Sequence, residues 1–169
     1  MTNLQHRLWH TIDEAPTPRW AERWRTPERT RALVIAYFSF LALSLLMEIG
    51  IFFSFHFMWP LLVAMACAMG SWTMLRNTIG AKDMAPRHAL DDYENQVLDQ
   101  WRSRALTLLN ALLIAGAVAS ILIGTILGEQ IRTAIFATAT GIYLLFTYLA
   151  VSTLPAVGFA LTFNRPTED

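Results

Sequence analysis

The chain has 169 residues, of which 54% are hydrophobic and 15% charged, and its formal net charge at pH 7 is zero. In the polar segments basic residues alternate with acidic ones, so the composition does not indicate a protein that binds nucleic acid. The single cysteine, Cys67, excludes an intrachain disulfide and the paired-cysteine chemistry of membrane oxidoreductases that pass electrons from thiols to quinones.

Three long blocks of the chain are almost without charge. Apart from a tyrosine and a cysteine, the only ionisable side chains in residues 32–75 are Glu48 and His56, and residues 105–128 and 133–164 contain no charged side chain. A helix needs about 20 consecutive apolar residues to cross a bilayer. The distribution therefore predicts an all-α integral membrane protein.

The first block is long enough for two helices joined by a turn near residues 54–60, where a tryptophan and a proline mark a helix start at a membrane boundary. We therefore expect four transmembrane helices in two hairpins. The expected spans are Arg31–Phe53, Trp59–Leu75, Ala105–Leu127 and Thr133–Thr153. The chain then divides into an N-terminal segment (1–30), a first hairpin (31–75), a central loop with a helix extension (76–104), a second hairpin (105–153) and a C-terminal tail (154–169).

The N-terminal segment contains threonine–proline pairs at residues 17–18 and 26–27, and both are typical helix starts. After the first pair, Trp20 and Trp24 lie one helical turn apart among charged residues. This pattern predicts a short amphipathic helix on the membrane surface. Such a helix either anchors the first span or binds lipid or a partner protein.

The central segment changes character at residues 89–109, ALDDYENQVLDQWRSRALTLL. Tyr93, Val97 and Trp101 recur at four-residue spacing, and acidic residues precede them, where they favour a helix start. We expect one long helix that begins in the cytoplasm and continues into the third span. The tail after Pro155 is also apolar, and it either continues the fourth helix with a kink or lies along the interface.

The basic residues are distributed asymmetrically about the predicted spans. Six arginines lie before or at the start of the first span, five basic residues lie between the second and third, and Arg165 follows the fourth. The two remaining turns contain only Arg132. Because basic residues are enriched in cytoplasmic loops, this distribution predicts that both termini and the central loop are cytoplasmic.

Small residues recur at four-residue spacing in the last two spans, which favours close packing of helix backbones in lipid. This spacing predicts contact between the two helices within one chain or, alternatively, an oligomer interface. The residues are Gly116, Ser120, Gly124 and Gly128 in the third span and Thr133, Ala137 and Gly141 in the fourth.

Glu48 is the one carboxylate inside the first block. It lies 17 residues beyond Arg31 (48 − 31), or roughly 25 Å at the rise of an α-helix, so we expect it near the outer boundary of a core about 30 Å thick. Four-helix multidrug exporters also have a glutamate in their first helix. Their glutamate lies deeper in the membrane and their chains are shorter, so this chain does not match them. With His56 and Glu129, Glu48 could form an ion or proton site, or the three could be unrelated interfacial residues.

No catalytic motif is present, and His56 is the only histidine near a span, so we expect neither an enzyme nor a haem or other cofactor. Residues 89–109, which lead from a helical hairpin into a span, resemble the start of the third helix in small multi-pass membrane proteins of actinobacteria. The resemblance implies a bacterial inner membrane and carries over no functional residues.

Two functions remain. The first is an accessory or scaffold subunit of a larger inner-membrane complex, in contact with lipids and with other membrane proteins or further copies of itself. The alternative is a small oligomeric transporter or channel that uses Glu48. Aromatic residues are enriched at interfaces, so the expected partner interface consists of Trp20, Trp24, Tyr93, Val97 and Trp101.

Overall fold

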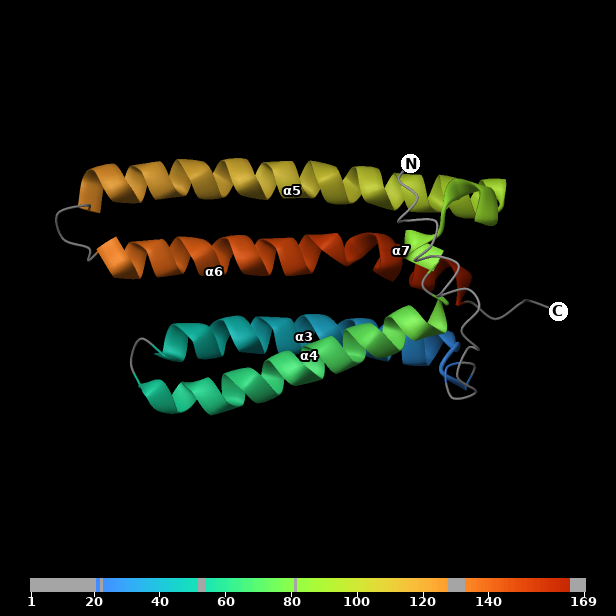
Figure 1. Ribbon diagram of the computed structural model, residues 1–169, viewed down its shortest axis with the longest axis horizontal. Helices are drawn as coiled ribbons and strands as arrows, with labels where there is room; N and C mark the ends of the chain where they lie inside the picture. The colour runs from blue at the N-terminus through green and yellow to red at the C-terminus, as the bar shows by residue number, and fades with distance from the viewer. Residues whose placement is uncertain (1–20, 22, 52–53, 81, 128–132, 165–169) are drawn as a thin grey trace. The chain divides into compact units, whose positions relative to one another are not determined.

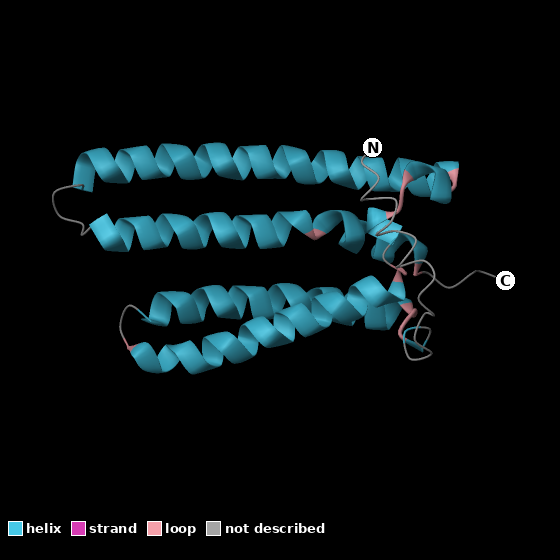
Figure 2. Cartoon of the chain, in the orientation of Figure 1, coloured by secondary structure: helices cyan, strands magenta, loops and turns pink. Residues whose placement is uncertain are grey.

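The computed structural model describes residues 21, 23–51, 54–80, 82–127 and 133–164. This part of the chain is helical and contains no strand (Figure 2). Four helices are long and apolar enough to cross a membrane. The main helices are α3 (Pro27–Ile51), α4 (Met58–Thr78), α5 (Asp92–Leu127), α6 (Thr133–Ser152) and α7 (Leu154–Phe163), with short 3₁₀ turns η1 (Phe55–Phe57), η2 (Lys82–Met84) and η3 (Arg87–Ala89) (Figure 1).

The first two long helices begin and end at local signals in the sequence. α3 begins at Pro27, four residues before the expected start of the span, and the Arg29 N–H donates to the Thr26 hydroxyl (3.4 Å). α4 continues to Thr78, three residues beyond the expected end. It stops where Gly80 adopts a left-handed conformation (φ +61°), which favours glycine.

α3 and α4 form an antiparallel hairpin joined through η1 (Figure 1). The buried residues of α3 recur every three or four positions, as expected for the face of one helix that packs against another. They are Thr30, Leu33, Tyr37, Leu41 and Ser44. α4 presents Ala64 and Ala68 as buried small residues, and the Tyr37 and Trp72 rings lie 5.9 Å apart.

α5 runs without a break from Asp92 to Leu127, so the predicted extension and the third span are one helix. Its 36 residues correspond to roughly 54 Å at the rise of an α-helix. This length exceeds the roughly 30 Å hydrocarbon core of a bilayer, so a bilayer would leave a large part of α5 outside its core.

The tail after α6 is a helix. Thr153 separates α6 from α7, and its hydroxyl donates to the carbonyls of Leu149 (3.2 Å) and Ala150 (3.1 Å). Pro155 has no N–H to continue the hydrogen-bond ladder, which accounts for the interruption. Residues 156–160 are all buried, so the tail is part of a core and does not lie exposed along a surface.

The chain forms two compact units, Met1–Trp101 with Pro155–Asp169 (unit 1) and Arg102–Leu154 (unit 2). The core of unit 1 joins segments that are distant in sequence, from α3, α4, the loop after α4, α5 and α7. Its buried members are Leu33, Leu75, Ile79, Ala85, Leu90, Leu98, Ala156, Val157, Phe159 and Ala160. We call the part of unit 1 formed by residues 23–33, 72–80, 82–101 and 155–164 the loop end.

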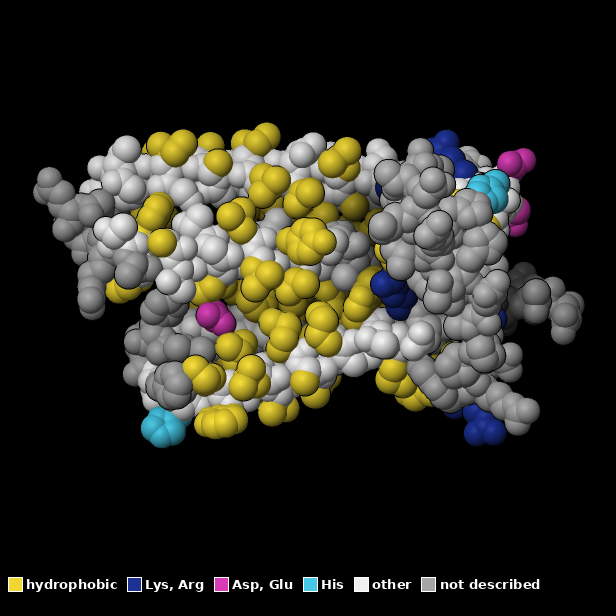
Figure 3. Space-filling model, viewed as in Figure 1, with side chains coloured by type: hydrophobic (Ala, Val, Ile, Leu, Met, Phe, Trp, Pro, Cys, Tyr) yellow, Lys and Arg dark blue, Asp and Glu magenta, His cyan; other side chains and the backbone are white. Residues whose placement is uncertain are grey.

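Hydrophobic side chains cover much of the surface along the lengths of the helices (Figure 3). In unit 1 the Lys and Arg side chains visible in this view lie at the end opposite the α3–α4 turn. The loop end is therefore the charged end of the unit.

Candidate functional site

Glu48 continues the helical periodicity of the buried positions of α3. The buried positions before it, Leu41 and Ser44, are 5% and 0% exposed, and Glu48 follows one helical turn later as a partly buried side chain. It lies three residues before the last residue of α3, Ile51. Glu48 is therefore near one end of the span, and its side chain is partly exposed.

Of the three residues of the expected ion site, the structure describes Glu48 and His56. His56 is an exposed residue of η1, and its Nδ1 lies 3.0 Å from the Ser54 hydroxyl. Glu129 lies outside the described residues. No group of three or more His, Cys, Asp or Glu side chains that could hold a metal ion occurs among the residues described. A site centred on Glu48 therefore stays a prediction.

In unit 2, small residues of α5 receive aromatic side chains of α6. The Tyr143 hydroxyl donates to the Leu112 carbonyl (2.5 Å), and a Cβ added at Gly116 would lie 2.2 Å from Tyr143 Cε1. One turn before the end of α5, Gly124 faces Phe136, whose Cζ would lie 4.0 Å from an added Cβ. The close approach between α5 and α6 is therefore that of a glycine on α5 to an aromatic ring on α6.

The small residues of α6 are on the surface of unit 2, and the alternative prediction for them, an oligomer interface, stays a prediction. Thr133, Ala137 and Gly141 are exposed, and nothing lies within 4 Å of a Cβ added at Gly141. Phe136, Thr140 and Tyr143 are partly buried and share a face of α6 that differs from the face of the small residues. Ser120 is partly buried, and Gly128 lies outside the described residues.

The expected partner interface is partly used within the chain. Val97 is buried, Trp101 lies against Gly158, and the Tyr93 ring packs edge-on to Phe163 (centroids 5.6 Å apart). Tyr93 nevertheless remains 59% exposed. The stripe on α5 therefore contacts α7 of the same chain, and Tyr93 is its one member that also presents a large free surface.

The two N-terminal tryptophans of the expected interface have different outcomes. Trp20, with most of the predicted amphipathic helix, lies outside the described residues. Trp24 is partly buried and packs against the core of unit 1, and the Arg29 guanidinium lies 5.6 Å from its ring centroid. Trp24 thus has a packing role that the amphipathic pattern did not predict.

The loop end contains a polar cluster that joins three helix ends. Asn164, which follows α7, donates through Nδ2 to the hydroxyls of Thr30 on α3 (2.9 Å) and Thr78 on α4 (3.4 Å). All three side chains are buried, and Arg25 Nε donates to the Thr78 carbonyl (2.7 Å). This cluster was not predicted from the sequence. The only sign of it there was a polar residue at each boundary of an apolar run.

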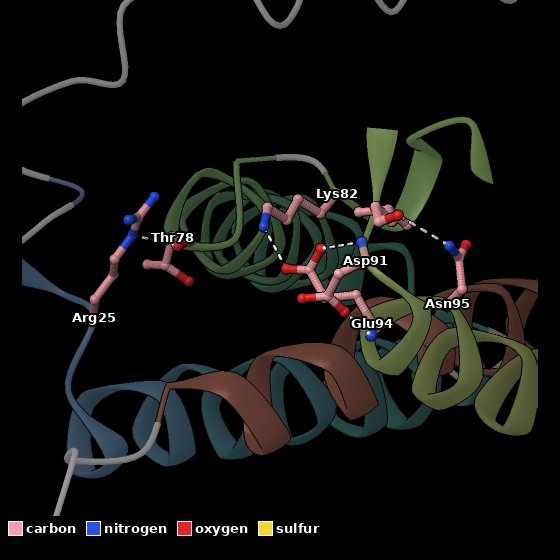
Figure 4. A network of polar contacts seen from close by, with 7 residues as sticks. Arg25, Thr78, Lys82, Asp91, Glu94 and Asn95 are labelled. Carbon is pink, nitrogen blue, oxygen red and sulfur yellow. Dashed lines mark hydrogen bonds and ion pairs between the residues drawn. The ribbon is translucent and has the colours of Figure 1, made fainter. Parts of the chain in front are cut away.

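The loop between α4 and α5 is held by a second network (Figure 4). Asp91 caps α5 by accepting from the Glu94 N–H (2.6 Å), while Glu94 accepts from the Asp91 N–H (3.3 Å). This reciprocal arrangement is a capping box. Glu94 is also ion-paired with Lys82, and Asn95 donates to the Arg87 carbonyl (2.8 Å). The loop is therefore tied to the first turn of α5.

Together these contacts make the loop end a fixed polar structure at the end of apolar helices. Among the buried side-chain nitrogen and oxygen atoms of the described residues, none is without a hydrogen-bond partner. No protein-family model, curated protein or solved structure matches this chain.

Proposed function

We propose that the chain is a small integral membrane protein that serves as a non-enzymatic accessory or scaffold subunit of a larger inner-membrane complex. The four long apolar helices support the membrane location. The excess of basic residues on one side of the spans supports cytoplasmic termini and a cytoplasmic loop end. The length of α5 supports a loop end that projects beyond the hydrocarbon core.

One observation carries the subunit role. Two large apolar side chains at the charged loop end, Met84 and Tyr93, are each 59% exposed. Both come from segments that hydrogen bonds and ion pairs hold in place, Met84 next to Asp83, which is paired with Arg76, and Tyr93 next to Glu94. Exposed aromatic and methionine side chains on a rigid polar surface fit a protein interface, where both residue types are enriched.

Site-specific photo-cross-linking tests this proposal. A photoreactive phenylalanine analogue at position 84 or 93 of the full chain should cross-link in membranes to the same protein. The matched control places the analogue at Gln96 or Gln100, exposed polar positions of α5. Cross-linking to one partner from positions 84 and 93 alone supports the subunit role, and equal, diffuse cross-linking from all four positions contradicts it.

The position of Glu48 favours a second candidate, an oligomeric transporter or channel. A carboxylate within a helix that crosses a bilayer is costly there and is usually functional. Glu48→Gln separates the two functions, because it removes the charge and keeps the shape. A transporter should lose flux in reconstituted vesicles, whereas an accessory subunit should retain assembly of its complex.

A further inference from the structure

The basic residues of the loop end fall into two groups that differ in their partners. Those at the end of α4 and in the loop after it each have a carboxylate partner, which neutralises their charge locally. The pairs are Arg76 with Asp83 (3.4 Å), Lys82 with Glu94, and Arg87 with Asp99 (2.7 Å).

The second group is the arginine cluster, Arg23, Arg25, Arg29 and Arg31, where the chain enters α3. Across the described part of the chain, no carboxylate is ion-paired with any of these four guanidinium groups. The segment 23–31 contains one acidic residue, Glu28, so four positive charges face one negative charge. This cluster therefore keeps an excess of positive charge that the loop does not.

Two of these guanidinium groups are nevertheless fixed in position. Arg25 Nε donates to the Thr78 carbonyl at the end of α4 (2.7 Å; Figure 4), and Arg29 donates through Nη1 to the Arg23 carbonyl. A carbonyl orients a guanidinium without cancelling its charge. The bond through Nε leaves both Nη groups of Arg25 available, and the side chain is exposed.

We propose that the arginine cluster binds the phosphate of an anionic phospholipid in the leaflet that α3 enters. The proposal rests on the membrane location proposed above. The cluster begins four residues before α3 and ends within its first two turns, the depth of the headgroups if α3 spans a bilayer. A planar guanidinium can bind two phosphate oxygens at once, and basic residues beside a span attract anionic lipid. Trp24, beneath the Arg29 guanidinium, is a residue type typical of this interface.

The test uses the full chain in a neutral detergent, with short-chain phosphatidylglycerol, short-chain phosphatidylcholine and inorganic phosphate as probes. Native mass spectrometry measures the Kd of each. The variant is Arg25→Gln with Arg29→Gln, and the control is Arg76→Gln with Arg87→Gln, which removes the same charge from residues that have carboxylate partners. The thermal midpoint of each variant checks its folding.

We expect the wild type to prefer phosphatidylglycerol, the cluster variant to weaken its binding about tenfold or more, and the control to change it less than twofold. If the cluster variant does not fold, Arg31→Gln replaces it, with a loss of about threefold expected because one of four charges is removed. If the cluster variant and the control variant bind phosphatidylglycerol with the same Kd, the proposal is overturned. It is also overturned if the wild type binds inorganic phosphate as tightly as phosphatidylglycerol. Extraction of the chain from membranes without detergent would refute the membrane location. Absence of a protein partner would refute only the subunit role.

Discussion

The indole of Trp101 lies so close to Gly158 that a Cβ at position 158 would be 2.0 Å from its Cδ2 atom. Both residues belong to unit 1, and the contact joins α5 to α7. A buried glycine is required here because a rigid ring occupies the space that any other residue would need. This contact is how the C-terminal helix joins the core of the loop end.

Gly158→Ala should therefore destabilise the protein by about 1–3 kcal/mol, because the indole must move within a packed core. Thermal unfolding in detergent measures the change. The matched control is Gly70→Ala in α4, where nothing lies within 4 Å of an added Cβ, and it should be neutral or slightly stabilising. Equal unfolding midpoints for the two variants would contradict the close contact between Trp101 and Gly158.

Asn164→Ala should loosen α7. The substitution removes the donor to the Thr30 and Thr78 hydroxyls in a buried site, which costs about 1–3 kcal/mol. Hydrogen exchange of the α7 amides should accelerate more than that of α6. Asn110→Ala, at an exposed position of α5, serves as the control and should leave exchange in α7 unchanged. Unchanged exchange in the Asn164 variant would contradict the role assigned to this cluster.

The α5–α6 contact predicts a coupling between Gly116 and Tyr143. Gly116→Ala alone should destabilise unit 2 by roughly 1 kcal/mol or more, because the added methyl meets the tyrosine ring. In a Tyr143→Ala background the same change should be nearly neutral, since the ring is gone. Unfolding of all four combinations in detergent measures the coupling energy. A value near zero would mean that the ring does not lie over Gly116.

Two ion pairs of the loop end should differ in strength because they differ in burial. The Glu94 side chain is 12% exposed and is also part of the α5 cap, whereas Asp99 and Arg87 are 44% and 72% exposed. Glu94→Ala should cost about 2 kcal/mol or more, since it leaves Lys82 and the cap without their acceptor. Asp99→Ala should cost less than about 1 kcal/mol. A lower unfolding midpoint for Asp99→Ala than for Glu94→Ala would contradict this order.

The four long apolar helices could be predicted from sequence because the absence of charge over 20 or more residues depends only on the chain itself. The start of α5 was also predictable, since acidic residues precede its periodic stripe. The burial of α7 was not, because an apolar tail after Pro155 fits an interface as well as a core. The hydrogen bond from Asn164, the residue after α7, to Thr30 joins residues 134 positions apart, a pairing that no local pattern encodes.

The small residues of unit 2 show a different limit. Their spacing predicted a close approach of helices and did not specify the group that approaches. Gly116 receives the ring of Tyr143, while Gly141 at the same kind of spacing remains open. Similarly, the stripe of Tyr93, Val97 and Trp101 indicated one packed face of α5, but only the structure identified α7 as its neighbour.

The subunit role is tested most directly by the mass of the native particle. The tagged full chain is purified in mild detergent without cross-linking, and native mass spectrometry measures the mass and composition of the complex. We predict a defined particle that contains at least one other membrane protein at fixed stoichiometry and that is weakened by Tyr93→Ser with Met84→Ser. Recovery of the chain as a homo-oligomer alone, unaffected by these substitutions, would contradict the subunit role and favour transport through Glu48.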